Sequence, residues 1–208
     1  MDRRTFSKLA LTGMGLACLP GPVARAGIGG AAMSFSGQGK PYERLLERAK
    51  AALAQHARSI PLHDRVALAD FNAASNEHRF HIVDLVSGRA MSCLVAHGRG
   101  SDPGHSGWLH RFSNEPGSLA TSSGAYRTAE IYHGMHGAAM RLNGLDPQNY
   151  NAESRAIVVH GADYVSENHI ATWGKLGRSE GCFAVARHIL PEVLGMLGPG
   201  RLIYADKV

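Results

Sequence analysis

The 208-residue sequence has little of what several protein classes require. It contains only three cysteines, and it has neither an HExxH motif nor a paired CxxC motif. An apolar stretch near the N-terminus, Leu9 to Leu19, is too short to span a bilayer as a stable helix. These absences argue against the common zinc sites and against a membrane-spanning protein, so we expect no metal, no cofactor and no membrane anchor.

The first 26 residues are typical of an export signal. The segment Asp2-Arg3-Arg4-Thr5-Phe6-Ser7-Lys8 resembles a twin-arginine motif, and the apolar stretch follows it directly. A cleavage site of small residues is available at Ala24-Arg25-Ala26. We therefore expect a periplasmic protein that is exported by the twin-arginine pathway and cleaved near Ala26.

Two other interpretations of the N-terminus are weaker. An amphipathic helix packed on the domain is disfavoured, because glycines and prolines at five positions between residues 13 and 22 interrupt helical continuity. A lipid anchor at Cys18 fits poorly, since Gly15 stands where such a signal has a large aliphatic residue. We expect Cys18 to leave with the signal.

Removal of the signal changes the charge balance. The formal net charge falls from +5 to +2, and no basic tract remains. The positive charge of the whole chain is therefore no argument for nucleic acid as a partner, and we expect none. The remaining length suits one domain with a sizeable core, which we expect to be a monomer.

The next segments predict a leader and a helix. Residues 27–40 are rich in Gly, Ala and Ser without periodicity, which indicates a flexible leader. Residues 41–65 predict an N-terminal helix and its connection, with Pro41 at the start. Packing of this helix on the domain is favoured over binding to a partner. Its apolar residues recur at helical spacing: Tyr42, Leu45, Leu46, Ala49, Ala52 and Leu53.

From residue 66 to residue 208 the chain predicts a mainly β domain with a few peripheral helices. Val66 to Phe71, His78 to Val86 and Arg89 to His97 are short β-type runs separated by turn residues, and they predict a meander. Further strands are expected at 126–132, 156–159 and 201–204, with a short helix at 191–197. The connection from 98 to 124 is long, and long loops on a β scaffold are often functional.

One cysteine and one histidine stand at the ends of apolar runs, each beside a glycine: Cys182 in Gly177-Arg178-Ser179-Glu180-Gly181-Cys182-Phe183 and His160 in Ile157-Val158-Val159-His160-Gly161. A cysteine is a useful nucleophile as the thiolate, and a nearby histidine can accept its proton. Gly181 leaves room for a substrate carbonyl. The backbone N–H groups of Gly181 and Cys182, if they point the same way, can stabilise an oxyanion.

The order of these motifs resembles a known family. His160-Gly161, a loop and then Ser179-Glu180-Gly181-Cys182 is similar to the active-site signature of the YkuD-type L,D-transpeptidases. Glu180 stands where the best-known branch has histidine, and the chain is closer to a second branch, the murein L,D-transpeptidase catalytic-domain family. Other motifs fall in the family's order: Ala96-His97-Gly98-Arg99-Gly100-Ser101, Phe112-Ser113-Asn114, Ser122-Ser123-Gly124-Ala125-Tyr126 and Arg155-Ala156-Ile157-Val158-Val159-His160-Gly161-Ala162.

The resemblance implies a fold and a reaction. The implied fold is a β-sandwich of the L,D-transpeptidase type. The implied catalytic residues are Cys182, His160, Gly181 and Gly161, whose carbonyl orients the histidine ring. The implied partners are peptidoglycan stem peptides: Cys182 forms a thioester with a donor stem and releases the terminal D-amino acid, and an acceptor amine resolves the thioester into a cross-link.

Two other functions stay open. If water resolves the thioester, the protein is an L,D-carboxypeptidase that uses the same residues. A catalytically silent wall-binding protein is the other alternative, and Glu180 favours it slightly.

Five residues are candidates for substrate binding: Arg178, Ser179, Tyr126, His133 and His136. Arg178 can bind a stem carboxylate, although an exposed structural arginine is equally consistent with the sequence. The segment between His160 and Cys182, residues 162–178, is expected to form part of the substrate wall.

The many histidines also raise the question of a metal site. His133 and His136 lie three residues apart, and His97, His105 and His110 belong to a nearby loop, but the sequence does not complete a ligand set. Glycine-flanked histidines at strand ends suit a polar groove equally well.

The second cysteine of the exported protein is Cys93. An oxidising compartment permits a disulfide between Cys93 and Cys182, which would silence the nucleophile. The apolar run Met91-Ser92-Cys93-Leu94-Val95 instead favours Cys93 as a buried strand residue.

Overall fold

The computed structural model describes residues 42–134 and 137–208. The expected signal over 1–26, the leader over 27–40, Pro41 and His136 lie outside the described residues, so the boundaries of signal, leader and domain stay predictions. The described residues form three α-helices, α1 Glu43–Gln55, α2 Glu167–Trp173 and α3 Leu190–Leu197, and one 3₁₀ helix, Arg99–Ser101. They also form eight strands: β1 Arg65–Asp70, β2 Phe80–Asp84, β3 Ala90–Cys93, β4 Gly124–Gly134, β5 Gly137–Gly144, β6 Val158–Ala162, β7 Phe183–Ala186 and β8 Leu202–Asp206.

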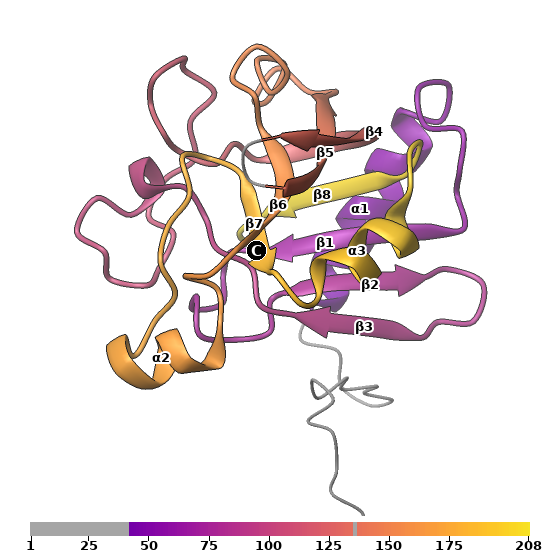
Figure 1. The fold of residues 1–208 in the computed structure, drawn as a ribbon. Coiled ribbons are helices and arrows are strands. Elements are labelled where there is room, and N and C mark those ends of the chain that lie inside the picture. The colour runs from indigo at the N-terminus through magenta and orange to yellow at the C-terminus, as the bar shows by residue number, and fades with distance from the viewer. Residues whose placement is uncertain (1–41, 135–136) are drawn as a thin grey trace, which may run out of the picture. The chain divides into compact units, whose positions relative to one another are not determined.

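All eight strands belong to one mixed sheet in the order β3-β2-β1-β8-β4-β5-β6-β7 (Figure 1). The antiparallel meander of β1, β2 and β3 confirms the prediction from the sequence. The last strand, β8, lies in the middle of the sheet, parallel to β1 and antiparallel to β4. The strands that carry the candidate site, β6 and β7, pair in parallel at one end.

The sheet folds over so that its two ends meet. Just after β3, Ala96 forms an antiparallel bridge with Ala184 of β7, and its N–H lies 2.8 Å from the Ala184 carbonyl oxygen. Side chains from β1–β3 and from β4–β7 therefore meet in one core, which confirms the mainly β sandwich-type fold. Large members of this core are Phe71, Phe80, Tyr126, Met140, Phe183 and Val185.

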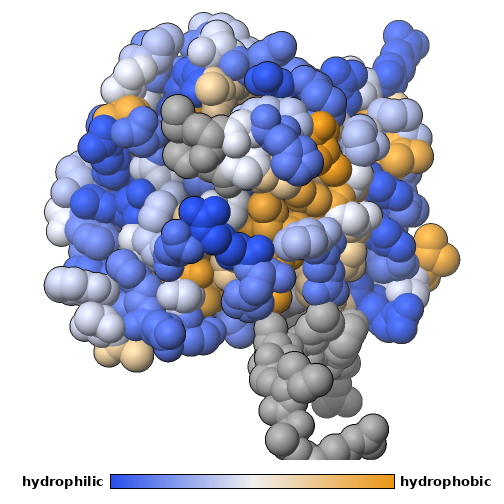
Figure 2. Space-filling model, in the orientation of Figure 1, coloured by the Kyte–Doolittle hydropathy of each residue, from blue (hydrophilic) through white to orange (hydrophobic). Residues whose placement is uncertain are grey.

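Two helices cover opposite faces of the sheet. The apolar side of α1 is buried in a second cluster with residues of β1 and β8, which confirms packing on the domain. Helix α3 packs its buried leucines and Val193 into the main core. In Figure 2, polar residues surround an apolar area that lies between α3 and the β4–β5 hairpin. Within the described ranges, no helix is long and apolar enough to cross a membrane.

Four elements were not predicted from the sequence: the 3₁₀ helix, strand β5, helix α2 and strand β7. Helix α2 buries none of its residues, so it has no apolar stripe to detect. Its ends do follow helix rules, because the Ser166 side chain accepts the His169 N–H and Gly174 ends the helix in the left-handed conformation. Strand β5 buries Met140 and Leu142 on either side of the more exposed Arg141, a short period-2 pattern that could have revealed it.

Candidate active site

The parallel pairing of β6 and β7 brings His160 and Cys182 to one end of the sheet. His160 pairs with Ala184, and Cys182 lies two residues before Ala184. Cys182 directly precedes β7, so the parallel pairing with β6 brings the start of β7 close to His160. Both line one cleft of about 770 Å³. Its other lining residues are Pro116, Gly117, Leu119, Tyr132, Ser154, Arg155, Ala156, Val158, Gly161, Ala162, Asp163, Tyr164, Arg178, Ser179, Glu180 and Arg187.

The Cys182 thiol is half-buried and lies 3.6 Å from the Ala156 carbonyl oxygen, to which it donates. Burial raises the pKa of the thiol, while the Val158 backbone N–H and the charge of Arg155 lower it and the charge of Glu180 raises it. The net direction of the pKa is upward. A thiol in this state needs a base to remove its proton during attack.

His160, the base expected from the sequence, lines the same cleft as Cys182. Its Nδ1 lies 3.2 Å from the carbonyl oxygen of Gly161. A carbonyl only accepts, so this contact requires the proton on Nδ1 and leaves the ring's proton-accepting lone pair on Nε2. The contact is the one that the family resemblance implies for Gly161. A Cβ at Gly161 would lie 3.2 Å from the Arg187 Cα, so the strand also packs closely there.

The loop of residues 177–182, named the nucleophile loop after the role expected of Cys182, requires a glycine at position 181. The φ of Gly181 is +115°, and a Cβ there would lie 2.8 Å from both the Ala120 carbonyl oxygen and the Ile157 Cδ1. The Gly181 N–H donates to the Ser179 Oγ at 3.2 Å. The Gly181 N–H is therefore engaged within the loop in this conformation, and the expected pair of oxyanion donors stays a prediction.

Ser179 closes the nucleophile loop from within. Its hydroxyl accepts from Gly181 and donates to the Cys182 carbonyl oxygen at 2.7 Å. Its backbone N–H donates to the His97 carbonyl oxygen at 2.9 Å. The buried Ser179 side chain therefore holds Cys182 in place through internal contacts; Ser179 also lines the cleft, and its substrate contact stays a prediction.

The remaining substrate candidates are separated by the structure. Arg178 lines the cleft, and its guanidinium donates to the carbonyl oxygens of Asp102 and Pro103. Tyr126 is fully buried in the core and donates its hydroxyl to the Ser122 carbonyl oxygen at 2.8 Å, so its expected substrate contact is wrong in this conformation. His133 is exposed on β4 and does not line the cleft.

The structure adds cleft residues that the sequence analysis did not single out. Tyr132 lines the cleft because it alternates with His133 along β4. Tyr164 also lines the cleft, and burial, Cys182 and Glu180 raise its pKa to about 12. Of the expected wall at 162–178, the two ends line the cleft, while the helix between them does not.

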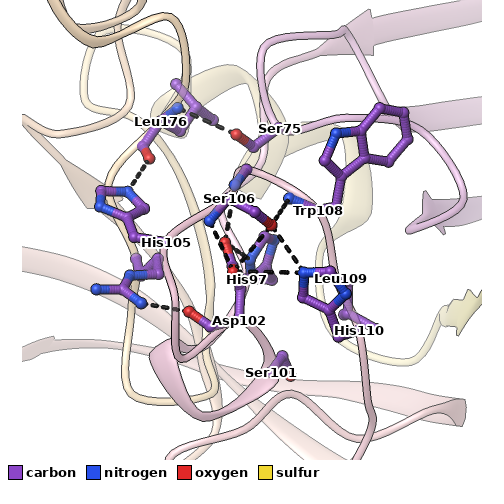
Figure 3. Close-up of polar contacts among 12 residues, drawn as sticks. Ser75, His97, Ser101, Asp102, His105, Ser106, Trp108, Leu109, His110 and Leu176 are labelled. Atoms are coloured by element: carbon purple, nitrogen blue, oxygen red, sulfur yellow. Dashed lines mark hydrogen bonds and ion pairs between the residues drawn. The ribbon is translucent and has the colours of Figure 1, made fainter.

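A polar cluster that includes the buried residues His97 and Asp102 lies next to the nucleophile loop, and Figure 3 shows its contacts. The Asp102 carboxylate accepts the backbone N–H groups of Ser106 and Gly107, each at 2.8 Å. Arg79, also buried, donates to the His97 Nδ1 at 2.7 Å, and burial lowers the pKa of His97 to about 3. The cluster therefore fixes the loop that bonds Ser179.

The histidines of this loop have protein partners. His105 Nε2 lies 2.8 Å from the Leu176 carbonyl oxygen, and His110 Nε2 lies 2.8 Å from the Ser106 Oγ. Within residues 42–134 and 137–208, no three His, Cys, Asp or Glu side chains are grouped to hold a metal ion.

Comparisons with known proteins bear on the whole chain. Residues 39–205 match the model of the L,D-transpeptidase catalytic domain. Among curated proteins no match is found.

Similar solved structures are more distant. An L,D-transpeptidase from Mycobacterium smegmatis has a TM-score of 0.42 and 13% identity, covering 69% of this chain and 58% of that one. L,D-transpeptidase 3 from Mycobacterium tuberculosis, in complex with a faropenem-derived adduct, has a TM-score of 0.45 and 13% identity, with coverage of 69% and 60%. The helical cell shape determining protein Pgp2 from Campylobacter jejuni has a TM-score of 0.44 and 12% identity, with coverage of 76% and 54%. The chain thus spans less than two thirds of each of these structures. Because the domain model spans most of the sequence, the chain belongs to the L,D-transpeptidase catalytic domain family.

Proposed function

We propose that the protein is a peptidoglycan L,D-transpeptidase in which Cys182 is the nucleophile and His160 is the base. The observation that carries the proposal is the arrangement of these two side chains. They line one cleft, His160 on β6 and Cys182 directly before the paired strand β7, and the Gly161 carbonyl directs the basic nitrogen of His160 to Nε2.

The first half of the reaction is acylation of the enzyme. The Cys182 Sγ attacks the carbonyl carbon of the third residue of the donor stem, meso-diaminopimelate in most Gram-negative walls, while His160 accepts the thiol proton. The tetrahedral intermediate collapses, the C–N bond breaks, and His160 returns the proton to the amine of the departing D-amino acid. A thioester between Cys182 and the stem remains.

The second half transfers the acyl group. A neutral amine of an acceptor stem attacks the thioester carbonyl, His160 accepts a proton from that amine, and the C–S bond breaks as the proton returns to sulfur. The new amide bond is the cross-link. In both halves the oxygen of the attacked substrate carbonyl becomes negative. The backbone N–H of Cys182, which belongs to the nucleophile itself, is the donor that we expect to stabilise that charge.

The cellular setting belongs to the same proposal. Peptidoglycan lies outside the cytoplasm, so the protein has to be exported to meet its substrate. We place it in the periplasm, reached through the twin-arginine signal with cleavage near Ala26.

The decisive experiment uses the protein from Gly27 onward with muropeptides that carry tetrapeptide stems. Mass spectrometry counts cross-linked dimers, trimmed tripeptide stems and released D-alanine, with Cys182→Ala as the inactive variant. Dimers that depend on Cys182 are expected. Trimmed tripeptides without dimers would make the protein a carboxypeptidase. If neither product forms, the silent wall-binding protein is the interpretation that remains.

A further inference from the structure

A half-buried arginine, Arg155, is built into the wall beside the nucleophile. We propose that Arg155 is an electrostatic positioning residue that favours the Cys182 thiolate and ties the wall loop, residues 113–122, to it. The inference rests on the proposed function for its catalytic meaning, but its physical content is a property of the thiol itself.

The guanidinium of Arg155 holds the wall loop through several hydrogen bonds. It donates to the Ser113 carbonyl oxygen at 2.9 Å, the Ser122 Oγ at 2.8 Å and the Ser118 Oγ at 3.3 Å. It also donates to the Ala120 carbonyl oxygen. A planar fork of donors suits such a set, which the point charge of a lysine cannot reproduce. The same loop supplies Pro116, Gly117 and Leu119 to the cleft.

All these acceptors are neutral, so the charge of Arg155 is not compensated by them. Among the residues that the structure describes, no carboxylate forms an ion pair with Arg155. The ionisable groups that act on its pKa, after burial, are Tyr126 and Cys182. A charge that is partly removed from water acts more strongly on its neighbours than an exposed one.

Arg155 and the thiol are neighbours through two short connections. The residue after Arg155, Ala156, provides the carbonyl oxygen that accepts the Cys182 Sγ–H. From the other side, a Cβ at Gly181 would lie 3.2 Å from the Arg155 Nη2, so the guanidinium packs against the residue before Cys182. A thiolate formed on transfer of the proton to His160 therefore has a fixed cation close to it.

The other charges at the cleft are arranged differently. Arg187 forms an ion pair with Asp163 at 2.6 Å, which compensates its charge. Glu180 is exposed, pairs with Arg99 at 2.7 Å and opposes the thiolate. Arg178 also lines the cleft, where its guanidinium donates to the carbonyl oxygens of Asp102 and Pro103. The charges that act on the Cys182 pKa are Arg155, which favours the thiolate, and Glu180, which opposes it, while Arg187 is a neutralised cation and serves as a control.

The test measures the pH dependence of Cys182 alkylation by iodoacetamide in the folded protein from Gly27 onward, with the Cys93→Ala substitution in every variant. Arg155→Gln keeps an amide donor for the loop but removes the charge. This substitution is expected to raise the pH midpoint of the alkylation rate by about one unit. At a fixed pH below the midpoint, alkylation would then be about tenfold slower. Glu180→Gln is expected to move the midpoint downward, and Arg187→Gln to leave it unchanged.

Arg155→Lys separates charge from loop positioning, because it keeps the cation and loses the fork. We expect an alkylation midpoint near that of the parent protein, with slower cross-linking. This variant also decides the matter if Arg155→Gln does not fold: a midpoint raised in Arg155→Lys would overturn the inference. Unchanged midpoints in folded Arg155→Gln would overturn it as well. If the parent protein forms no dimers but Arg155→Gln still raises the alkylation midpoint, the inference is supported and the transpeptidase proposal is refuted.

Discussion

The cleft and the interior of this protein use the same residue types under opposite conditions. In the cleft, Cys182 is half-buried beside backbone donors and Arg155. In the interior, Cys93 of β3 is 7% exposed, and burial followed by the charge of Glu192 raises its pKa to about 12. Both thiols are free. Cys93 ends the apolar strand β3 and Cys182 directly precedes the apolar strand β7, so the comparison shows that the neighbours of a thiol decide its chemistry.

The histidines repeat the contrast. His160 contacts a carbonyl that fixes its tautomer, while His97 accepts a hydrogen bond from Arg79 on Nδ1 and is held neutral by burial. In His97 the lone pair is used by a structural partner. In His160 the Nδ1 nitrogen carries the proton, so Nε2 is the nitrogen that can accept another one.

The largest expected effect comes from replacing each of the two cysteines by alanine in turn. Cys182→Ala should abolish D-alanine release and cross-linking, since the covalent intermediate cannot form. Cys93→Ala should leave both reactions in place and cost roughly 1–3 kcal/mol of unfolding free energy, because it removes a buried sulfur from the core. Product counting by mass spectrometry and denaturant unfolding measure the two effects. Residual activity in Cys182→Ala would contradict the assignment.

The next effect concerns the base. His160→Gln should slow acylation by about 100-fold to 10,000-fold, the range for loss of a general base. The matched substitution His97→Gln should act mainly on stability, because His97 supports the loop from behind. Single-turnover release of D-alanine separates the two. Equal losses of acylation rate in both variants, with both folded, would show that His160 has no special role.

A smaller effect is expected for the glycine beside the nucleophile. Gly181→Ala places a methyl 2.8 Å from a backbone carbonyl oxygen in a conformation that favours glycine, with strain of about 1–3 kcal/mol. The loop should shift and the acylation rate should fall by at least about tenfold. Gly104→Ala is the control, because nothing lies within 4 Å of a Cβ there. A Gly181→Ala protein with the parent rate would mean that the loop tolerates the shift.

The site could be predicted from the sequence where its signal is local. Cys182, His160 and Gly181 stand in short motifs, and the structure brings the thiol and the imidazole to one cleft. Arg155 was part of a family motif, but its role was invisible because its loop partners lie 33 to 42 residues away. Tyr126 was misjudged for a related reason, since a tyrosine on an alternating strand does not reveal which face is the core.

The fold shows the same division. The meander and α1 depend on local periodicity and were predicted, whereas the placement of β8 between β1 and β4 depends on pairing across most of the chain. Helix α2 was missed because it buries no residue, so tertiary packing left no pattern in its sequence.

The smallest expected effect tests whether the interior histidines are structural. Burial lowers the pKa of His97 to about 3 and that of His81 to about 4, below the ordinary value of about 6.5. At a pH between the lowered pKa and about 6.5, each histidine binds a proton in the unfolded chain but not in the folded one. The unfolding free energy should therefore fall as the pH drops from about 6.5 toward the lowered pKa values. Each histidine contributes a slope of up to about 1.4 kcal/mol per pH unit. His97→Asn should lower stability at pH 7, because it disturbs the contact with Arg79, yet it should flatten the acid slope. Denaturant unfolding of the parent and the variant from pH 7 to pH 4 measures the slopes. Parallel curves would mean that His97 is protonated without cost in the folded protein, and the contrast with His160 would then lose its physical basis.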